Sequence, residues 1–325
     1  MGRSNHILYS YGFNAKGNVQ ALSAETIANE IESKNFAWVH LDNSHEKTMS
    51  WLRQELDFLD TVVLDALTEE STRPRCEVIG KGVLLILRGA NLNKDAKPED
   101  MVSLRIWVDE ERMITLQRRS LKAVLDFEKK LLNGQIEGNA GACLAHLVSL
   151  LTQRMEPELN RVGEILDELE EQVLEDPAHV LSEQVVDVRK KSILFKKFLL
   201  PQQVALDECL ETDLDWLNDK SLRLLSESYN RTCRYIEGLD AVRERAQVVR
   251  DELASALTEK LNKNMYLLSI VTAIFLPLGF LTGLLGVNVG GMPGAENPHA
   301  FYYFCVILVV LVLIQMVMFV KLKWF

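Results

Sequence analysis

Apolar residues concentrate near the C-terminal end of the chain, in two long runs without a charged side chain. The runs are Met265 to Leu285 and Phe301 to Val320. A helix of the first length rises by roughly 31 Å, which matches the hydrocarbon core of a bilayer. The connecting loop, 286–300, is short enough to allow only a tight turn. The pattern predicts a hairpin of two transmembrane helices at 265–285 and 301–320, with a buried hairpin in a soluble fold as the alternative.

The N-terminal part of the chain, 1–140, shows a different pattern, in which short apolar stretches of strand length are mixed with helical stretches. The expected strands are 37–41, 83–87, 102–108 and 113–116, and the expected helices are 46–56 and 121–132. Turn residues at 80–82 and an acidic turn at 109–111 are typical of antiparallel hairpins. The segment 1–140 is therefore predicted to form an α/β domain.

Strand patterns disappear from residue 141 onward, and helical patterns replace them. Helices are expected at 142–175, 178–200 and 219–285, with breaks at Pro177 and Pro201 because the residue before a proline disfavours helix. Pro157 predicts a kink or break inside the first of these helices. The rest of the chain is thus divided into a helical stalk, 141–264, and a two-helix transmembrane domain, 265–325.

The helix expected at 219–285 also has the periodicity of a coiled coil. Between Asp219 and Lys263 it contains no proline and a single glycine, Gly238. Its apolar residues recur with a mean spacing of about 3.5, at positions 222, 225, 229, 233, 236, 239, 242, 246, 249, 253, 257 and 261. A helix of this length measures about 100 Å and cannot bury its apolar side alone. We expect it to pack along its length against other helices.

Charged residues become rare where the transmembrane pattern begins. The chain has 36 Lys and Arg against 46 Asp and Glu, and beyond residue 264 only Lys321, Lys323 and Glu296 are charged. This acidic balance argues against nucleic-acid binding. The five cysteines form no CxxC pair, which argues against a disulfide framework or a thiolate zinc site.

Basic residues set the expected orientation of the hairpin. Lys260 and Lys263 precede the first span, Lys321 and Lys323 follow the second, and the loop has no basic residue. Because cytoplasmic flanks carry the excess of Lys and Arg, both chain ends are expected in the cytoplasm. The N-terminal segment lacks the apolar core of a signal peptide, in agreement with this orientation. The prediction is a multi-pass protein of the inner or plasma membrane.

A second stripe, small and polar, follows one face of the long helix into the first span. Its members are spaced by threes and fours: Asp251, Ser255, Thr258, Asn262, Met265, Ser269, Thr272, Leu276, Gly279, Gly283 and Gly286. One interpretation is a helix–helix contact face, because small residues allow close packing in lipid. The other is a pore wall, with the acidic Asp251 and the polar Ser255 and Thr258 in an inner funnel. A protomer with two spans cannot enclose a pore, so the second interpretation requires several copies.

The end of the first span carries Gly286, Val287 and Asn288. A helix that ends at glycine exposes carbonyl oxygens, and Asn288 adds an amide oxygen at the rim. A ring of neutral oxygens accepts hydrogen bonds from the inner water shell of a hydrated divalent cation. The alternative for these three residues is an ordinary helix cap and turn. Their position directly after a segment long enough to cross a bilayer favours the cation site.

These residues resemble the CorA family of divalent-cation transporters. That family carries Gly-Met-Asn at the end of the first of two C-terminal spans, and Gly-Val-Asn is the variant of its ZntB branch. Similar segments cover nearly the whole chain, at 38–42, 65–67, 73–75, 168–177, 260–265, 273–278 and 282–288. The family loop after the motif commonly reads Met-Pro-Glu-Leu, whereas here Met292 and Pro293 are followed by Gly294 and Ala295. This departure argues against magnesium selectivity.

The resemblance implies a homopentameric funnel with a cytoplasmic α/β domain, a stalk of long helices and a central pore lined by the first span. Gly286, Val287 and Asn288 would form the selectivity ring, with Asn288 holding the hydrated ion. The implied cargo is Zn²⁺, with Ni²⁺ and Cd²⁺ as companions and coupling to protons. A Mg²⁺ or Co²⁺ channel of the CorA type is the alternative.

Other polar groups have simpler interpretations. Glu296 and His299 in the loop are expected to attract cations electrostatically to the outer mouth, with direct coordination as the alternative. His40, Asp42 and His45 are expected to be capping groups in a loop rather than metal ligands. The acidic stretches 164–175 and 207–215 are expected to be solvated helix faces that hold cations nearby.

No phosphate-binding loop, nucleophile triad or HExxH motif occurs, so the sequence predicts neither an enzyme nor a bound cofactor. The expected partners are lipid, divalent cations and further copies of the chain. A membrane-anchored coiled-coil scaffold or sensor without transport remains the alternative from another class.

Overall fold

The computed structural model describes residues 6–13, 19–23, 27, 36–56, 59–175, 182–287, 294 and 297–321. The chain separates into two compact units, Met1–Asp251 and Glu252–Phe325. The boundary lies inside one helix, α8 (Asp219–Gly286), so this helix contributes its first half to one unit and its second half to the other.

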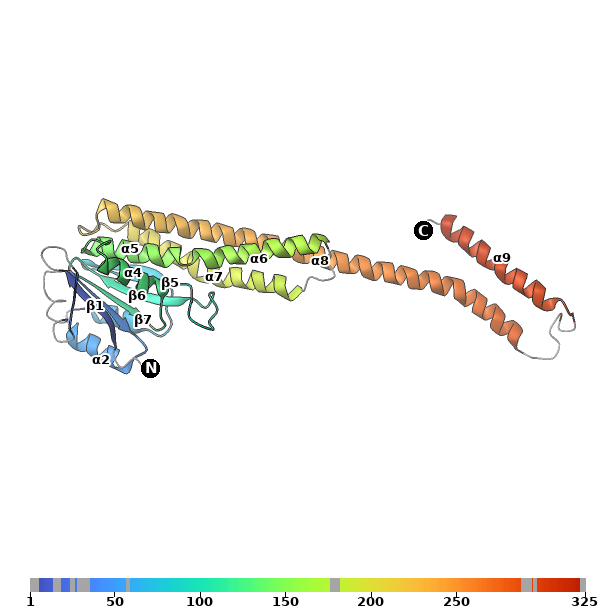
Figure 1. Ribbon diagram of the computed structural model, residues 1–325, viewed down its shortest axis with the longest axis horizontal. Helices are drawn as coiled ribbons and strands as arrows, with labels where there is room; N and C mark the ends of the chain where they lie inside the picture. The colour runs from blue at the N-terminus through green and yellow to red at the C-terminus, as the bar shows by residue number, and fades with distance from the viewer. Residues whose placement is uncertain are drawn as a thin grey trace. The chain divides into compact units, whose positions relative to one another are not determined.

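A mixed β-sheet lies at the left-hand end of the first unit in Figure 1. Among the described residues its strands are β1 (Ile7–Phe13), β2 (Val19–Ala21), β3 (Ala37–Asp42), β4 (Arg75–Ile79), β5 (Gly82–Gly89), β6 (Val102–Val108) and β7 (Arg112–Gln117). They are ordered β2-β1-β3-β7-β6-β5-β4. β3 and β7 run parallel, and the other neighbouring pairs run antiparallel.

Helices cover both faces of this sheet. On one face, Trp38 and Leu85 pack with Phe127 of α4 (Lys122–Leu132) and with α5 (Ala140–Gln153). On the other face, Val39 and Leu84 pack with α2 (Glu46–Glu55) and α3 (Thr61–Thr68). Successive residues of β3 therefore point into different cores, as strand geometry requires. Because both faces are buried, β5 is apolar from Val83 to Leu87 without alternation. The predicted α/β domain is confirmed.

Both predicted hairpins are present. Gly80 has a φ of +63° in the turn between β4 and β5, a backbone conformation that glycine adopts without steric cost. In the turn between β6 and β7, the Asp109 Oδ1 accepts from the backbone N–H groups of Glu111 and Arg112, both at 3.0 Å. β1, β2 and α3 were not anticipated from the sequence.

Helices follow the sheet, as predicted. They are α6 (Glu156–Glu175), α7 (Ser182–Leu210), α8 and α9 (Ala300–Lys321). The predicted break near Pro157 is confirmed, because α5 ends at Gln153 and α6 begins at Glu156. Pro157 thereby lies in the first turn of a helix, where a backbone N–H has no helical acceptor and its loss costs little.

The predicted helix end at Leu200 is wrong, because α7 continues through Pro201 to Leu210. Tertiary packing explains the continuation. Gln202 is fully buried, and its Oε1 accepts from the backbone N–H of Arg88 on β5 at 2.7 Å. Ala205 and Leu206 belong to the main apolar core. These contacts offset the cost of a proline inside a helix, about 3 kcal/mol.

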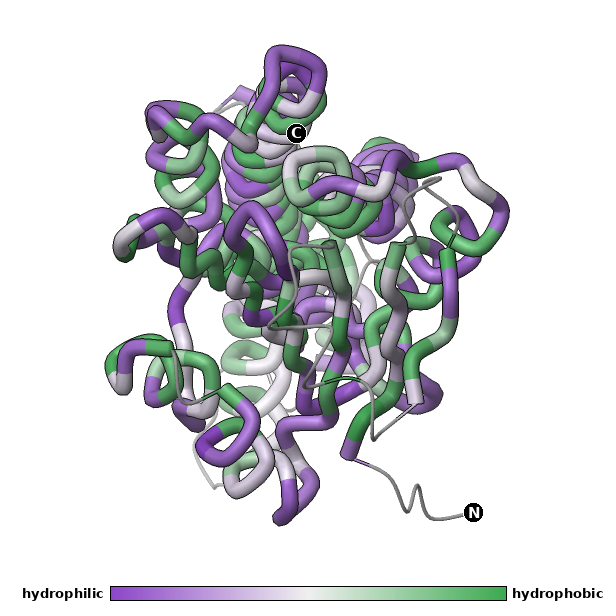
Figure 2. The backbone as a smooth tube through the Cα atoms, turned by 90° about the vertical axis from the view of Figure 1, so that its left-hand side faces the viewer, coloured by the Kyte–Doolittle hydropathy of each residue, from purple (hydrophilic) through white to green (hydrophobic). Residues whose placement is uncertain are grey.

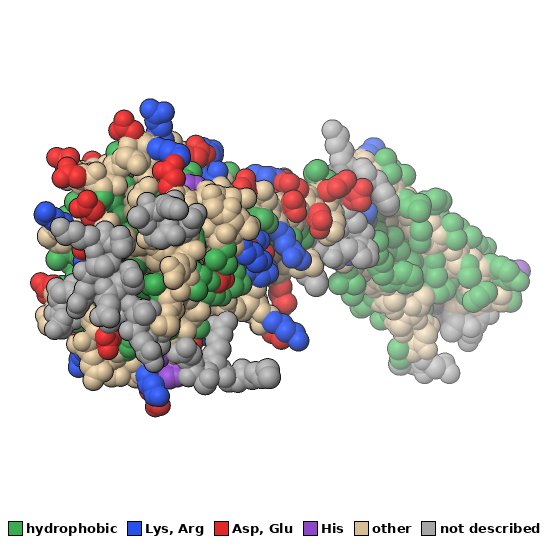
Figure 3. All heavy atoms as spheres, turned by 60° about the vertical axis from the view of Figure 1, so that its left-hand side comes forward, with side chains coloured by type: hydrophobic (Ala, Val, Ile, Leu, Met, Phe, Trp, Pro, Cys, Tyr) green, Lys and Arg blue, Asp and Glu red, His purple; other side chains and the backbone are tan. Residues whose placement is uncertain are grey.

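The second unit contains the end of α8 and the helix α9, both long and apolar enough to cross a bilayer. Hydrophobic side chains dominate the faded part of Figure 3, whereas acidic and basic side chains gather on the first unit. In Figure 2 hydrophilic and hydrophobic positions are mixed along the first unit, with hydrophilic residues at many of its outer turns. The predicted succession of α/β domain, long helices and two C-terminal apolar helices is confirmed.

Candidate functional site

The helix α8 presents two opposite faces within the second unit. One face is partly buried, at Ile270, Ala273, Ile274, Pro277, Leu278 and Leu281. On this face the Gln315 Nε2 of α9 donates to the Ala273 carbonyl oxygen at 3.2 Å. The less exposed residues of α9 recur at a similar spacing, at Phe304, Cys305, Leu308, Leu311, Val312, Gln315 and Phe319. We call these two sets of residues the α8–α9 seam.

The polar stripe predicted from the sequence lies on the face of α8 away from this seam. Thr272, Leu276, Gly279 and Gly283 each follow a seam residue by two positions. Two positions correspond to a rotation of about 200° around a helix axis. The stripe residues from Asn262 to Gly283 are all exposed within the chain. The structure thus leaves the stripe uncovered by α9.

The hydroxyl groups of the stripe present oxygen acceptors rather than donors. Thr258 donates to the Ala254 carbonyl, Ser269 to Met265 and Thr272 to Leu268, each at 2.8 Å. Each hydroxyl hydrogen is therefore engaged along the helix, and the oxygen lone pairs remain. Such oxygens accept hydrogen bonds from the water shell of a cation.

None of the described residues packs closely against the glycines of the stripe. A Cβ added to Gly279, Gly283 or Gly286 would meet no heavy atom of the described residues within 4 Å. Glycine inside a helix costs roughly 0.5–1 kcal/mol relative to alanine. Small residues at such a face allow another helix or molecule to approach closely.

The far end of the stripe is only partly described. Gly286 is the last residue of α8 and Val287 is exposed. Asn288 and Glu296, two of the predicted site residues, lie outside the described residues. His299 is exposed, and its backbone N–H donates to the Asn297 Oδ1 at 2.9 Å, just before α9 begins.

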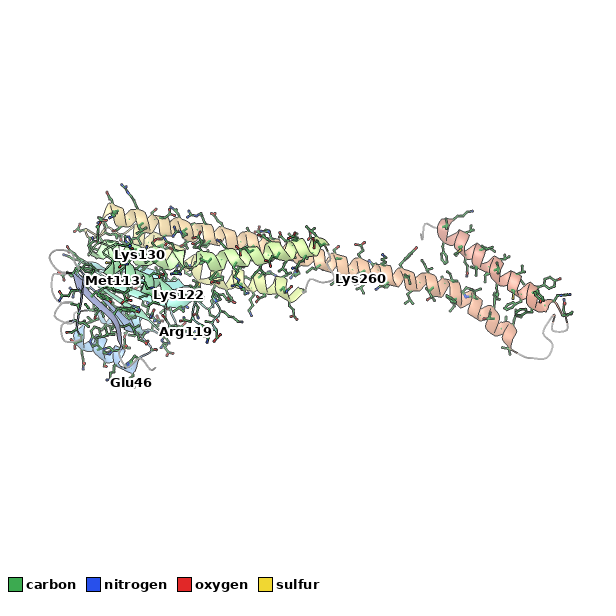
Figure 4. All side chains as sticks on the ribbon, viewed as in Figure 1. Glu46, Met113, Arg119, Lys122, Lys130 and Lys260 are labelled. Carbon is green, nitrogen blue, oxygen red and sulfur yellow. The ribbon has the colours of Figure 1, made fainter. Side chains whose placement is uncertain are left out.

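The residues of the predicted inner funnel precede the apolar segment on α8. Asp251, Ser255 and Thr258 are all exposed on α8. The Asp251 carboxylate accepts from the Gln247 Nε2 at 2.8 Å and pairs with the Arg250 guanidinium at 3.6 Å, so the chain itself offsets part of its charge. Lys260, labelled in Figure 4, follows on the same helix before the apolar segment.

Asp42 and His45 are capping groups, as predicted, whereas His40 lies inside strand β3, so its predicted place in a loop is wrong. His40 is buried, with Nδ1 2.7 Å from the Thr115 Oγ1. The Asp42 Oδ1 accepts from the backbone N–H of Ser44, and the His45 Nδ1 caps α2 through the N–H of Lys47 at 3.1 Å. Among the described residues, no group of three or more His, Cys, Asp or Glu side chains is arranged to hold a metal ion.

The acidic stretch 164–175 occupies the outer face of α6, as predicted. Leu166, Leu169 and Val173 are buried, while the acidic side chains point outward. Asp167 and Glu170 pair with Arg245 of α8, which raises the pKa of that guanidinium. Part of this negative charge is therefore neutralised by the chain itself.

Comparison with known proteins identifies related chains. The family model described as CorA-like Mg²⁺ transporter protein matches residues 33–323. The chain is 35% identical to the divalent cation transporter CmaX of Pseudomonas aeruginosa, over 99% of this chain and 98% of that protein. It is 32% identical to the zinc transport protein ZntB of Yersinia enterocolitica, over 94% and 92% of the two lengths.

Solved structures similar to this chain are also those of cation transporters. The structure of full-length CmaX matches with a TM-score of 0.85 and 34% identity, over 99% of both chains. The CorA magnesium transporter of Methanocaldococcus jannaschii matches with a TM-score of 0.82 over 98% of this chain and 99% of that one. At 20% identity, the second likeness shows the fold alone.

Proposed function

This chain belongs to the family of CorA-like Mg²⁺ transporter proteins, and we propose that it moves divalent cations across the inner or plasma membrane through a pore formed by several copies of α8. The two C-terminal apolar helices provide the membrane anchor that this function requires. The curated relatives are transporters rather than enzymes, in agreement with the lack of catalytic motifs in the sequence.

The observation that carries the proposal is the position of the polar stripe opposite the α8–α9 seam. Because α9 occupies one face of α8, the opposite face is free to adjoin a central axis in an assembly. The stripe continues through the apolar segment, where polar and small residues have no value against lipid tails. A scaffold helix has no need for such a continuation.

The proposed assembly is a homopentamer, in which Asn262, Met265, Ser269, Thr272, Leu276, Gly279 and Gly283 line the pore. Gly286, Val287 and Asn288 form its outer ring, and Glu296 and His299 attract cations to the mouth. Asp251, Ser255 and Thr258 line the inner funnel. The acceptor oxygens of Ser269 and Thr272 support passage of a cation that keeps its water shell.

Zinc is the proposed cargo, with Ni²⁺ and Cd²⁺ as further substrates and a proton gradient as the driving force. Support comes from the zinc transport proteins among the relatives and from the Gly-Val-Asn form of the motif. Mg²⁺ or Co²⁺ is the competing cargo, since the matching family model names Mg²⁺. Both cargoes use the same pore.

Flux into liposomes containing the full chain tests the proposal. Zn²⁺, Ni²⁺, Cd²⁺, Mg²⁺ and Co²⁺ are offered separately, with and without an imposed pH gradient, and entry is followed with an internal indicator. We expect Thr272→Leu to reduce flux by roughly tenfold or more, because it replaces an acceptor oxygen with a bulky apolar group in the pore wall. Asn288→Ala is expected to reduce flux and to alter the order of preference among the cations.

Thr282→Leu is the matched control. Thr282 is exposed on the same helix, and its hydroxyl also donates within the helix, to the Leu278 carbonyl at 2.9 Å. It lies about 80° from Thr272 around the axis, outside the stripe. Its flux should stay close to that of the native chain. Equal effects at 272 and 282 would refute the pore wall. A native chain that assembles but gives no more flux than protein-free liposomes would favour the scaffold.

A further inference from the structure

Pro277 lies in the middle of the first apolar segment, where it removes one hydrogen bond from α8. In an α-helix the N–H of residue 277 would donate to the carbonyl oxygen of Ala273, four residues earlier. Proline has no N–H, so this carbonyl lacks its usual helical donor. Hydrocarbon offers no water in its place, and an unsatisfied carbonyl there is costly.

Gln315 of α9 supplies a donor to that same carbonyl. Its Nε2 lies 3.2 Å from the Ala273 oxygen, although the two residues are 42 positions apart in the chain. Gln315 is 8% exposed, whereas its neighbours Ile314 and Met316 are 59% and 53% exposed. The side chain is therefore turned inward to α8 and away from lipid.

The second apolar segment offers few side chains that could form such a hydrogen bond. Between Phe301 and Val320, Gln315 is the single residue with an amide or charged side chain. A polar side chain is expensive in a membrane-spanning segment unless it has a partner. Here the one amide of that segment meets the one carbonyl of the first span whose helical donor is replaced by proline.

We infer that Gln315 is a positioning residue, which replaces the backbone hydrogen bond lost at Pro277 and thereby limits the bend of α8 at that level. Its link to transport rests on the proposed function, because Thr272 and Leu276 of the stripe lie near the proline on the opposite face. Proline is a common site of helix bending, and a bend there would shift both residues. The hydrogen bond between Gln315 and Ala273 stands independently of transport.

The amide is held through its nitrogen alone. The Gln315 Oε1 is buried and has no hydrogen-bond partner among the described residues. One hydrogen bond between membrane helices is worth little enough to open and close during a conformational change. The pairing is therefore suited to a reversible contact rather than to a permanent one.

A double-mutant cycle on the full-length protein in detergent tests the inference. The variants are Gln315→Leu, Pro277→Ala and their combination, and the readout is the midpoint of thermal unfolding. Gln315→Leu should lower the midpoint by about 2 °C. In the Pro277→Ala background the loss should fall to less than half, because the introduced alanine restores a helical donor to the Ala273 carbonyl. Met316→Leu, at the exposed neighbouring position, is the control and should leave the midpoint unchanged.

Two outcomes would overturn the inference: an equal loss in both backgrounds, which would assign Gln315 to packing alone, or no loss in the native background. If Gln315→Leu does not assemble, Gln315→Met keeps the length of the side chain without its donor and completes the same cycle.

Flux in liposomes separates this inference from the proposed function. Gln315→Leu should change cation flux by about threefold or more, and the change should shrink in the Pro277→Ala background. If the native chain moves no cation but the two substitutions are coupled in the thermal cycle, the hydrogen bond is supported and the transport proposal is refuted. Normal flux in the native chain without coupling in the thermal cycle would support the transport proposal and overturn the inference about Gln315.

Discussion

The two units of the chain differ in the exposure of their large apolar side chains. In the first unit Trp38 and Phe127 are fully buried, and their rings meet edge to face with centroids 4.7 Å apart. In the second unit Phe275 and Leu276 are 66% and 71% exposed. The first unit therefore carries its own apolar core, whereas the described residues of the second unit leave most of its apolar side chains uncovered.

The two prolines inside long helices show the same difference. Around Pro201 the core residues Ala205 and Leu206 hold α7 in place. Around Pro277 the surroundings are apolar and exposed, and a side-chain hydrogen bond from Gln315 replaces the lost backbone donor. Burial in the core, together with the hydrogen bond from Arg88 to Gln202, offsets the proline in the first unit, whereas a side-chain hydrogen bond alone offsets it in the second.

Phe127→Ala gives the largest expected effect on this comparison. We expect it to destabilise the first unit by about 3–5 kcal/mol, because it opens a cavity against Trp38 in a closed core. Phe275→Ala, at an exposed position in the second unit, should change the unfolding of the first unit by less than about 0.5 kcal/mol. Thermal unfolding followed by tryptophan fluorescence measures both. Similar losses for the two variants would contradict the division into a core-bearing and a coreless unit.

Pro201→Ala is expected to have a smaller effect of opposite sign. The alanine N–H can donate to the Lys197 carbonyl, so α7 should gain about 1 kcal/mol after the entropy of the more flexible unfolded chain is subtracted. The same substitution at Pro277 should raise the free energy of unfolding by less, because the Gln315 Nε2 already donates to the Ala273 carbonyl. The unfolding midpoints of the two single variants measure the difference. A larger gain at Pro277 would reverse the comparison.

The smallest effect concerns pH and is confined to the first unit. Burial, His45 and Lys47 lower the pKa of His6 below its ordinary value of 6.5. The folded state therefore favours neutral His6, and this stability is present above about pH 6.5 and is lost as the pH falls towards the lowered pKa. His6→Gln should reduce the acid sensitivity of unfolding between about pH 7.5 and 5.5. An unchanged pH dependence would show that other groups govern it.

Much of the fold follows from local patterns. The expected helices at 46–56, 121–132 and 219–285 correspond to α2, α4 and α8 with closely similar bounds. Both hairpins were also predicted, because glycine and acidic turn residues act over a few positions. β1 escaped prediction because serine and glycine interrupt the apolar and aromatic residues from Ile7 to Phe13, and its place is set by pairing with β3.

For the candidate site, spacing alone identifies the stripe from Asn262 to Gly283, and its role in a pore stays a prediction. Gln315 was not among the residues expected to matter. The available signal was that it is the one amide in the apolar run 301–320. Its partner could not be predicted, because the Ala273 carbonyl belongs to a different helix.

By itself, the sequence determined the two charge-free spans, the long helix and the faces of that helix, since length and periodicity act between residues a few positions apart. Tertiary structure alone decided that α7 passes through Pro201, that the sheet runs β2-β1-β3-β7-β6-β5-β4, and that Gln315 meets the Ala273 carbonyl. Each of these depends on contacts between distant segments, whose energies exceed local preferences but leave no periodic trace in the chain.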